Sequence, residues 1–154
     1  MTRVIIPLAP KPFQRTGWSG ETRTGKRYRV NPPAYTAYKE QLGWYLKPFA
    51  PQEMIVKEAV SVVLISVFKF PNNWSLKKRE EMRASPRAVG ADVDNLGKSM
   101  LDAMQGVRWF KNDYQVAHLE SIKVWGDKSG MILDVEWPWN PHYKREIANL
   151  IKKI

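Results

Sequence analysis

The sequence predicts an α/β or α+β domain, with a small mixed β-sheet flanked by helices. Apolar residues recur every three or four positions in some stretches, and in others they alternate or run continuously with β-branched residues. The two kinds of stretch follow one another along the chain, as in layered folds that pack helices on a sheet. With 154 residues, 44% of them apolar, the chain is large enough to form one hydrophobic core.

The first half of the chain should hold two strands and two helices. We expect a short strand over residues 3–8, followed by a basic loop to about Asn31. A helix should open at Asn31 and end before Pro51, with an apolar stripe formed by Tyr35, Tyr38, Leu42, Tyr45, Leu46 and Phe49. The β-branched run over 58–70 predicts a central strand covered on both faces. Ser75 is a suitable N-cap for a short basic helix after it.

The second half should add a helix, two strands and a final helix. The spacing of Leu96, Met100, Leu101 and Met104 predicts a helix that follows Asp94 and ends at Gly106. Strands over 115–125 and 131–137 should form a β-hairpin around the glycines of residues 126–130. Asn140 and Pro141 should begin an added C-terminal helix. We therefore expect one domain over residues 1–137, with a helical extension of the same domain over 138–154.

Positive charge is concentrated near the start of the chain. The net charge is +10, and residues 1–50 carry nine basic and two acidic side chains. A glycine-rich cationic segment favours a polyanionic partner, because arginine binds phosphate oxygens with two parallel hydrogen bonds. The alternative is a solvated loop that only aids solubility. The side chains expected to contact DNA are Arg15, Arg23, Lys26, Arg27, Arg29, Lys77, Lys78 and Arg79.

Several classes of protein are excluded by what the sequence lacks. There is no cysteine and there are only two histidines, so disulfides, thiol nucleophiles and Cys-ligated zinc or iron–sulfur sites are ruled out. The longest apolar stretch is about ten residues, against about 20 needed to span a bilayer. The phosphate-binding and nucleophile-elbow glycine motifs are also missing. We expect a cytoplasmic protein without a membrane partner.

Acidic residues gather where the third predicted helix begins. Asp92 and Asp94 are two positions apart, so their carboxylates converge if the chain is extended as far as Asp94. The competing interpretation is that one caps the helix and the other is solvated. Lys98 and Asp102 follow at intervals of four residues on the same helical face. The connection after the helix is long enough to bring Asp113 back to the pair.

Clustered carboxylates need a counter-ion, and hard oxygen ligands select Mg²⁺, with Mn²⁺ as a substitute. Such an ion can polarise a phosphate and activate a water, while a nearby lysine neutralises developing charge. An acidic centre on a cationic body therefore indicates phosphodiester hydrolysis of nucleic acid.

The string from Asp92 to Lys98, followed by Asp102-Ala103, Asp113, Gln115-Val116 and Lys123, resembles the RusA family of Holliday junction resolvases. The resemblance extends from Pro7 to about Trp137. It implies a homodimeric, Mg²⁺-dependent endonuclease of DNA recombination and repair that nicks two opposed strands of branched, four-way DNA junctions. It also implies a role for each matching residue. Asp92, Asp94 and Asp113 would be the catalytic metal ligands, and Lys98 would support the reaction.

Two positions depart from the family pattern or from helical preference. Asn112 stands where the family often has an acid, and Gly97 costs about 1 kcal/mol relative to alanine inside a helix unless a close approach requires it. The family occurs in bacteria and in their phages and prophages. The alternative function is a non-catalytic, basic nucleic-acid-binding protein, in which the aspartates are only helix caps and surface charges.

Overall fold

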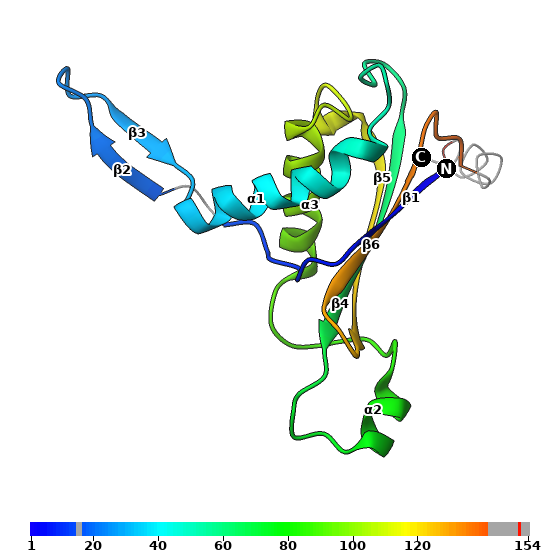
Figure 1. Ribbon diagram of the computed structural model, residues 1–154. Helices are drawn as coiled ribbons and strands as arrows, with labels where there is room; N and C mark the ends of the chain where they lie inside the picture. Colours follow the sequence, from blue (N-terminus) through cyan, green and yellow to red (C-terminus); the bar gives the residue numbers. More distant parts are fainter. Residues whose placement is uncertain (15–16, 142–150, 152–154) are drawn as a thin grey trace.

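The computed structural model describes residues 1–14, 17–141 and 151. Four strands form one mixed sheet in the order β1-β6-β4-β5 (Figure 1): β1 is Thr2–Ile6, β6 Gly130–Glu136, β4 Val60–Lys69 and β5 Val116–Gly126. β4 pairs in parallel with β5 and antiparallel with β6, and β6 pairs antiparallel with β1. The expected α/β class with a small mixed sheet is confirmed.

Two long helices, α1 (Pro33–Leu46) and α3 (Val93–Gly106), pack on each other and cover one face of this sheet (Figure 1). The core between the layers includes Tyr35, Tyr38, Leu42 and Leu46 of α1, and Leu96, Met100 and Met104 of α3. Trp109, which is fully buried, donates from Nε1 to the carbonyl oxygen of Leu46 at 3.2 Å. The aromatic stripe of the first helix is therefore core, except that Tyr45 and Phe49 stay partly exposed.

Shorter elements lie outside this two-layer body. α2 (Leu76–Met82) is capped by Ser75, whose Oγ accepts a hydrogen bond from the main-chain N–H of Lys78. Two turns of 3-10 helix, η1 (Lys47–Phe49) and η2 (Asp113–Gln115), follow α1 and precede β5. Strands β2 (Gly17–Glu21) and β3 (Arg27–Val30) form a separate antiparallel hairpin that projects from the body beside the start of α1 (Figure 1). We call residues 17–30 the basic arm.

Three structural predictions from the sequence need correction, and a fourth falls largely outside the described residues. The basic segment contains the hairpin of the arm rather than only a loop. β5 and β6 do not pair as a hairpin, because β4, apolar on both faces, lies between them and pairs with both. Helices bury only one face of β4, while Val63, Ile65 and Val67 on the other face are half-buried. Residues 138–141 are not helical, and most of the expected C-terminal helix, 142–150 and 152–154, lies outside the described residues.

Candidate active site

The acidic pair lies at the N-terminus of α3. The helix begins at Val93, two residues earlier than the extended-chain argument required, so Asp92 is the N-cap residue and Asp94 is in the first turn. Asp92 has extended backbone angles, φ −68° and ψ 139°, but its side chain forms no capping hydrogen bond. Both aspartates are exposed, and neither has an ion-pair partner within 1–14 and 17–141. Their carboxylates are therefore available to an external ligand.

Strand β5 fixes the main chain on both sides of Asp92. Ser121 Oγ donates to the carbonyl oxygen of Val93 at 3.0 Å, and Lys123 Nζ donates to that of Ala91 at 2.7 Å. The lysine also lies 3.4 Å from the carbonyl oxygen of Val89. These two side chains, spaced to face the same side of the strand, hold the residues directly before and after Asp92.

The loop that leads into Asp92 is shaped by Arg87 and Gly90. The Arg87 guanidinium lies 4.2 Å from the ring centroid of Phe68 and 4.9 Å from that of Trp125. Gly90 has φ +78°, and a Cβ there would lie 2.6 Å from Arg87 Nη1. The positive φ favours glycine at this position, whereas the guanidinium, at the end of a flexible side chain, could shift to admit a Cβ.

Gly97 allows α3 to lie close to β5. A Cβ at this position would meet Leu119 Cδ2 at 3.3 Å and Ser121 Cβ at 3.6 Å. The close approach explains a glycine inside the helix, since a larger side chain would push α3 away from the strand that holds the acidic loop.

Lys98 stands one turn after Asp94 on the exposed side of α3. Its Nζ lies 4.6 Å from the ring centroid of Phe13, whose main-chain N–H donates to Asn95 O at 2.8 Å. Ser99 Oγ donates to Lys11 O at 2.8 Å. The segment before the basic arm is therefore docked along α3, beside the lysine that the sequence assigns to the reaction.

Asp113 lies near the opposite end of α3 from the acidic pair. It begins η2, and Gln105, in the last turn of α3, donates from Nε2 to Lys111 O at 3.1 Å. The buried Gln115 accepts from the main-chain N–H groups of Lys111 and Asn112 and donates to Ile55 O. Because α3 has 14 residues, it rises about 21 Å between the two ends. The expected return of Asp113 to the pair is not found within one chain.

No three acidic or histidine side chains of the described residues form a group that could hold a metal ion. A three-carboxylate centre therefore has no counterpart inside a single copy of this part of the chain. Asp92 and Asp94 are together, and Asp113, also exposed, is held apart from them.

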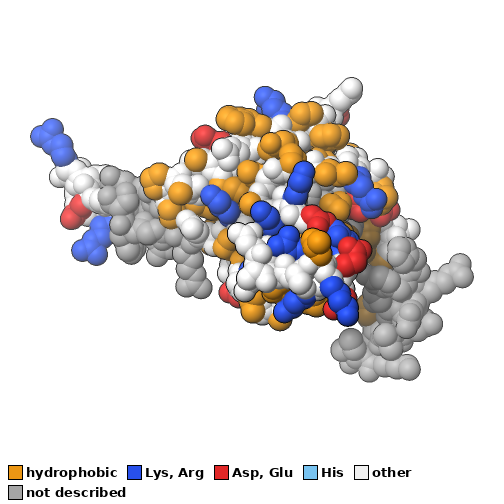
Figure 2. All heavy atoms as spheres, turned by 60° about the horizontal axis from the view of Figure 1, so that its bottom comes forward, with side chains coloured by type: hydrophobic (Ala, Val, Ile, Leu, Met, Phe, Trp, Pro, Cys, Tyr) orange, Lys and Arg blue, Asp and Glu red, His pale blue; other side chains and the backbone are white. Residues whose placement is uncertain are grey.

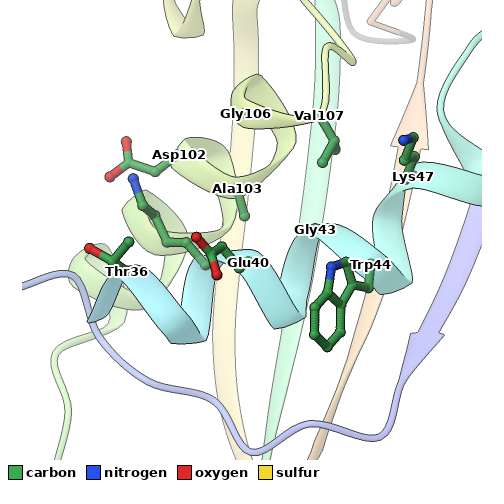
Figure 3. Close-up of a pocket in the computed structure, with 10 residues that line it drawn as sticks. Thr36, Glu40, Gly43, Trp44, Lys47, Asp102, Ala103, Gly106 and Val107 are labelled. Atoms are coloured by element: carbon green, nitrogen blue, oxygen red, sulfur yellow. The ribbon is translucent and has the colours of Figure 1, made fainter. Parts of the chain in front are cut away.

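Asp102 has a structural role at the contact between the long helices. Tyr35 Oη donates to its carboxylate at 3.1 Å. Burial, and then the charge and hydrogen bond of Asp102, raise the pKa of Tyr35 above its ordinary value. Asp102 also lines a groove of about 360 Å³ between α1 and α3, with Lys39, Glu40 and the exposed Trp44 (Figure 3). Among the described ion pairs, none joins Asp102 to Lys98.

The expected DNA-contacting residues have different settings. On the basic arm, the side chains of Arg23, Lys26 and Arg27 are exposed, whereas Arg15 and the side chain of Arg29 lie outside the description. On α2, Lys77 is exposed and Lys78 Nζ lies 4.6 Å from the Trp74 ring centroid. Arg79 is half-buried and donates to Asn72 O at 3.0 Å, which partly commits its guanidinium. Figure 2 turns the α2 end toward the viewer and shows Lys and Arg over that face and on the arm.

An exposed acidic pair on a body with net charge +10 and a projecting basic arm is the arrangement of an enzyme that acts on nucleic acid. The family model described as "Endodeoxyribonuclease RusA" matches residues 7–136, most of the chain, so the chain belongs to the RusA family of endodeoxyribonucleases. It is thus a Holliday junction resolvase, a nuclease of DNA recombination and repair, and the non-catalytic alternative is set aside. A search of curated proteins gives no match. None of the described helices has both the length and the apolar composition needed to cross a membrane.

Sequence reasoning proposed the acidic pair and Lys98 as site residues but did not identify the residues that hold them. Ser121 acts through a main-chain carbonyl, and no sequence pattern identifies such a contact. Lys123 and Gln115 belong to the matched motif, and their side-chain bonds now give them a physical role. Gln115 shapes the turn of Asp113, and Lys123 shapes the loop of Asp92.

Proposed function

We propose that this resolvase is a homodimer that uses Mg²⁺ to nick opposed strands of a four-way DNA junction. Asp92, Asp94 and Asp113 are its metal ligands, and Lys98 stabilises negative charge that develops on the phosphate. The observation that carries the proposal is the exposed acidic pair at the start of α3, free of protein ion pairs in the described residues and held by β5. Such fixed carboxylates suit a ligand that enters from solvent.

The donor set fits a hard divalent cation. Carboxylate oxygens are the ligands that Mg²⁺ and Mn²⁺ prefer, and Asp92 does not use its oxygens to cap the helix. A bound ion of this kind supplies a polarised phosphate oxygen and a water of lowered pKa. The chain itself contributes the position of the carboxylates and, from the next turn of α3, the ammonium of Lys98.

A site that uses all three aspartates requires two copies of the chain. Within one copy, η2 is attached near the C-terminal end of α3, about 21 Å along the helix from Asp92. The Asp113 that completes the site must therefore belong to the other copy. A two-fold dimer then carries two such sites, which matches the approximate two-fold symmetry of a four-way junction.

The cationic surfaces hold the DNA backbone in this proposal. Arg23, Lys26 and Arg27 of the basic arm, and Lys77 and Lys78 of α2, are exposed and can contact phosphates. Phosphate contacts carry no base information, so recognition of the junction rests on shape. The natural location of such an enzyme is the cytoplasm of a bacterial cell, where chromosomal, prophage and phage DNA recombine.

The test uses Asp92→Asn and Asp94→Asn with a labelled four-way junction. Each variant should lose Mg²⁺-dependent nicking by about 100-fold, since loss of a ligand costs at least as much as loss of an outer-sphere residue that orients one. Junction binding in EDTA should be unchanged or tighter, because an anion is removed from a phosphate-facing surface. Glu53→Gln, which neutralises another exposed carboxylate, is the matched control. Nicking at the wild-type rate by both aspartate variants would refute the assignment.

A further inference from the structure

Strand β5 is an edge strand with a free segment in its middle. Near its end, the main chain of Lys123 and Trp125 bonds to residues 84–87: Arg87 N–H donates to Lys123 O, Trp125 N–H to Ser85 O, and Ala84 N–H to Trp125 O. At residues 123 and 125, the main-chain groups therefore point outward, that is, away from β4 and toward the open edge of the sheet. Because the directions alternate along a strand, the N–H and C=O groups of Leu119 and Ser121 also point outward.

No hydrogen-bond partner is present for these outward groups of Leu119 and Ser121 in the described part of the chain. A bulge at Ala117 marks the other limit of the regular strand, since Val60 pairs with Val116 and Ser61 with His118. The free edge thus spans His118 to Ile122. Unpaired main-chain groups on an edge strand are a template for pairing with another strand.

Exposed apolar side chains lie along this edge and at its ends. Leu119 is 42% exposed and Ile122 is 39% exposed, although both belong to a strand of the central sheet. Tyr114, directly before β5, is 75% exposed, and Val93, whose carbonyl accepts the Ser121 bond, is 39% exposed. Leu119 packs toward Gly97 of α3, whereas Ile122 lies on the opposite face with Ile65 and Ile132. Apolar side chains therefore flank the unpaired main-chain groups on both faces of the sheet, as on an edge that another strand covers.

We infer that the free edge of β5 pairs antiparallel with the same edge of a second copy, with the two-fold axis at Leu119. Residue 119 then faces residue 119 of the second copy and exchanges both main-chain hydrogen bonds with it. The proposal rests on the dimer of the proposed function and assigns its surface. Pairing is limited on one side by the bulge and on the other by residues 84–87.

The position of Glu120 favours this register over its neighbours. With the axis at Leu119, His118 of each copy faces Glu120 of the other, and Val116 faces Ile122. The His118 ring is fixed within its own chain, because Nδ1 lies 2.8 Å from Ser61 Oγ and the ring stacks on Trp139 at a centroid distance of 5.2 Å. An axis at Glu120 would set two glutamates against each other, and an axis at His118 would pair two histidines and leave both glutamates opposite valine.

The same pairing explains how the catalytic set becomes complete. The antiparallel direction of the pairing turns the η2 end of one copy toward the Lys123 end of β5 in the other copy, where Lys123 Nζ holds the carbonyl of Ala91 beside Asp92. The dimer therefore brings Asp113 of one chain to the end of β5 where the other chain holds its acidic pair. Sheet pairing and catalytic geometry, argued from different residues, require the same partner.

Cysteine crosslinking tests the register, because the chain has no cysteine of its own. Residues in a hydrogen-bonded antiparallel pair have Cα atoms about 5.5 Å apart, within disulfide range, whereas diagonal neighbours are about 7–8 Å apart. Under mild oxidation, Leu119→Cys should form a covalent dimer at least tenfold faster than His118→Cys or Glu120→Cys alone. A mixture of the latter two variants should form the mixed disulfide.

A charge reversal tests the interface without a crosslink. Glu120→Lys should raise the dimer dissociation constant, measured by sedimentation, about tenfold, because it removes the carboxylate that faces His118 at two symmetric places. Glu136→Lys, the same change on an exposed position of β6, is the matched control and should leave the constant unchanged. The double variant His118→Glu/Glu120→Lys sets a glutamate against each lysine and should restore the dimer.

A monomeric protein at micromolar concentration, or a dimer in which Leu119→Cys crosslinks no faster than the two neighbouring variants, would overturn the inference. A monomeric protein would also remove the dimer of the proposed function, whereas the crosslinking result separates the interface from the catalytic assignment. If nicking depends on Asp92 but Leu119→Cys does not crosslink, only this interface is refuted. If Leu119→Cys crosslinks but Asp92→Asn nicks at the full rate, only the catalytic assignment is refuted.

Discussion

Replacing Lys123 by methionine should weaken the response to Mg²⁺ while leaving the fold intact. Methionine keeps the length and the apolar stem of the side chain but removes the donor that bonds Ala91 O at 2.7 Å. The main-chain bond from Arg87 N–H to Lys123 O and the Ser121 bond to Val93 O remain. The loop before Asp92 therefore keeps its path but loses one of the contacts that fix it.

The size of the effect follows from the bond that is lost. A hydrogen bond from a charged donor contributes about 1.5–3 kcal/mol, and about 1.4 kcal/mol corresponds to a factor of ten. Part of this free energy supports folding, and the rest positions the carboxylate of Asp92. We expect the Mg²⁺ concentration for half-maximal nicking to rise about 10- to 100-fold, as for other residues that orient metal ligands.

The assay is the single-turnover nicking rate of a four-way junction as a function of Mg²⁺ concentration. Lys128→Met, a change at an exposed lysine in the β5–β6 loop, is the matched control, and Lys123→Arg should retain much of the wild-type response. An unchanged Mg²⁺ requirement for Lys123→Met would refute the positioning role. A lower maximal rate at an unchanged Mg²⁺ requirement would instead mean that the lysine acts on the DNA.

Three further predictions concern the cations of the basic arm, the contact of α3 with β5, and the ion pair between Arg3 of β1 and Asp134 of β6. Replacing the three exposed arm cations Arg23, Lys26 and Arg27 by alanine should lower the salt dependence of junction binding by up to about 3 in log–log slope, with no change in the saturated nicking rate. In urea unfolding, Gly97→Val should destabilise the protein by about 1–3 kcal/mol, because a Cβ there is already tight against Leu119, and Gly97→Ala should be much milder. The Arg3 guanidinium beside Asp134 holds the pKa of that carboxyl below its usual range, so this stabilisation is present above about pH 4 and is lost as the pH falls through the lowered pKa. Asp134→Asn should therefore flatten the acid side of the melting-temperature profile.

Local patterns predicted most of the helices and strands, but not the hairpin of the basic arm. Helical spacing predicted α1 and α3, and Asp92, Asp94 and Lys98 could be proposed as site residues because they are close along the chain. The order of the strands could not be predicted, because β4 pairs on both edges and its sequence does not indicate which strands lie beside it. The distance from Asp113 to the pair was also hidden. It depends on Gln105 and Gln115, which attach the connection near the C-terminal end of α3 instead of letting it return.

The contacts that hold the acidic loop could not be predicted from spacing either. Ser121 and Lys123 reach main-chain carbonyls of residues 28 and 32 positions earlier, and only the packing of α3 on β5 brings them together. Gly97 is the one supporting position that the sequence indicated, because glycine is unfavourable inside a helix unless another element approaches closely. The structure shows that this element is β5.

Mixing two inactive variants tests the central claim most directly, namely that one chain supplies Asp92 and Asp94 and the other supplies Asp113. Asp92→Asn and Asp113→Asn should each fail to nick a junction as separate proteins. After the chains are exchanged, a mixed dimer has one site with both substitutions and one site with neither, so nicking of a single strand per dimer should return. If the mixture stays as inactive as its components while mixed dimers form, the three aspartates do not combine across the two chains.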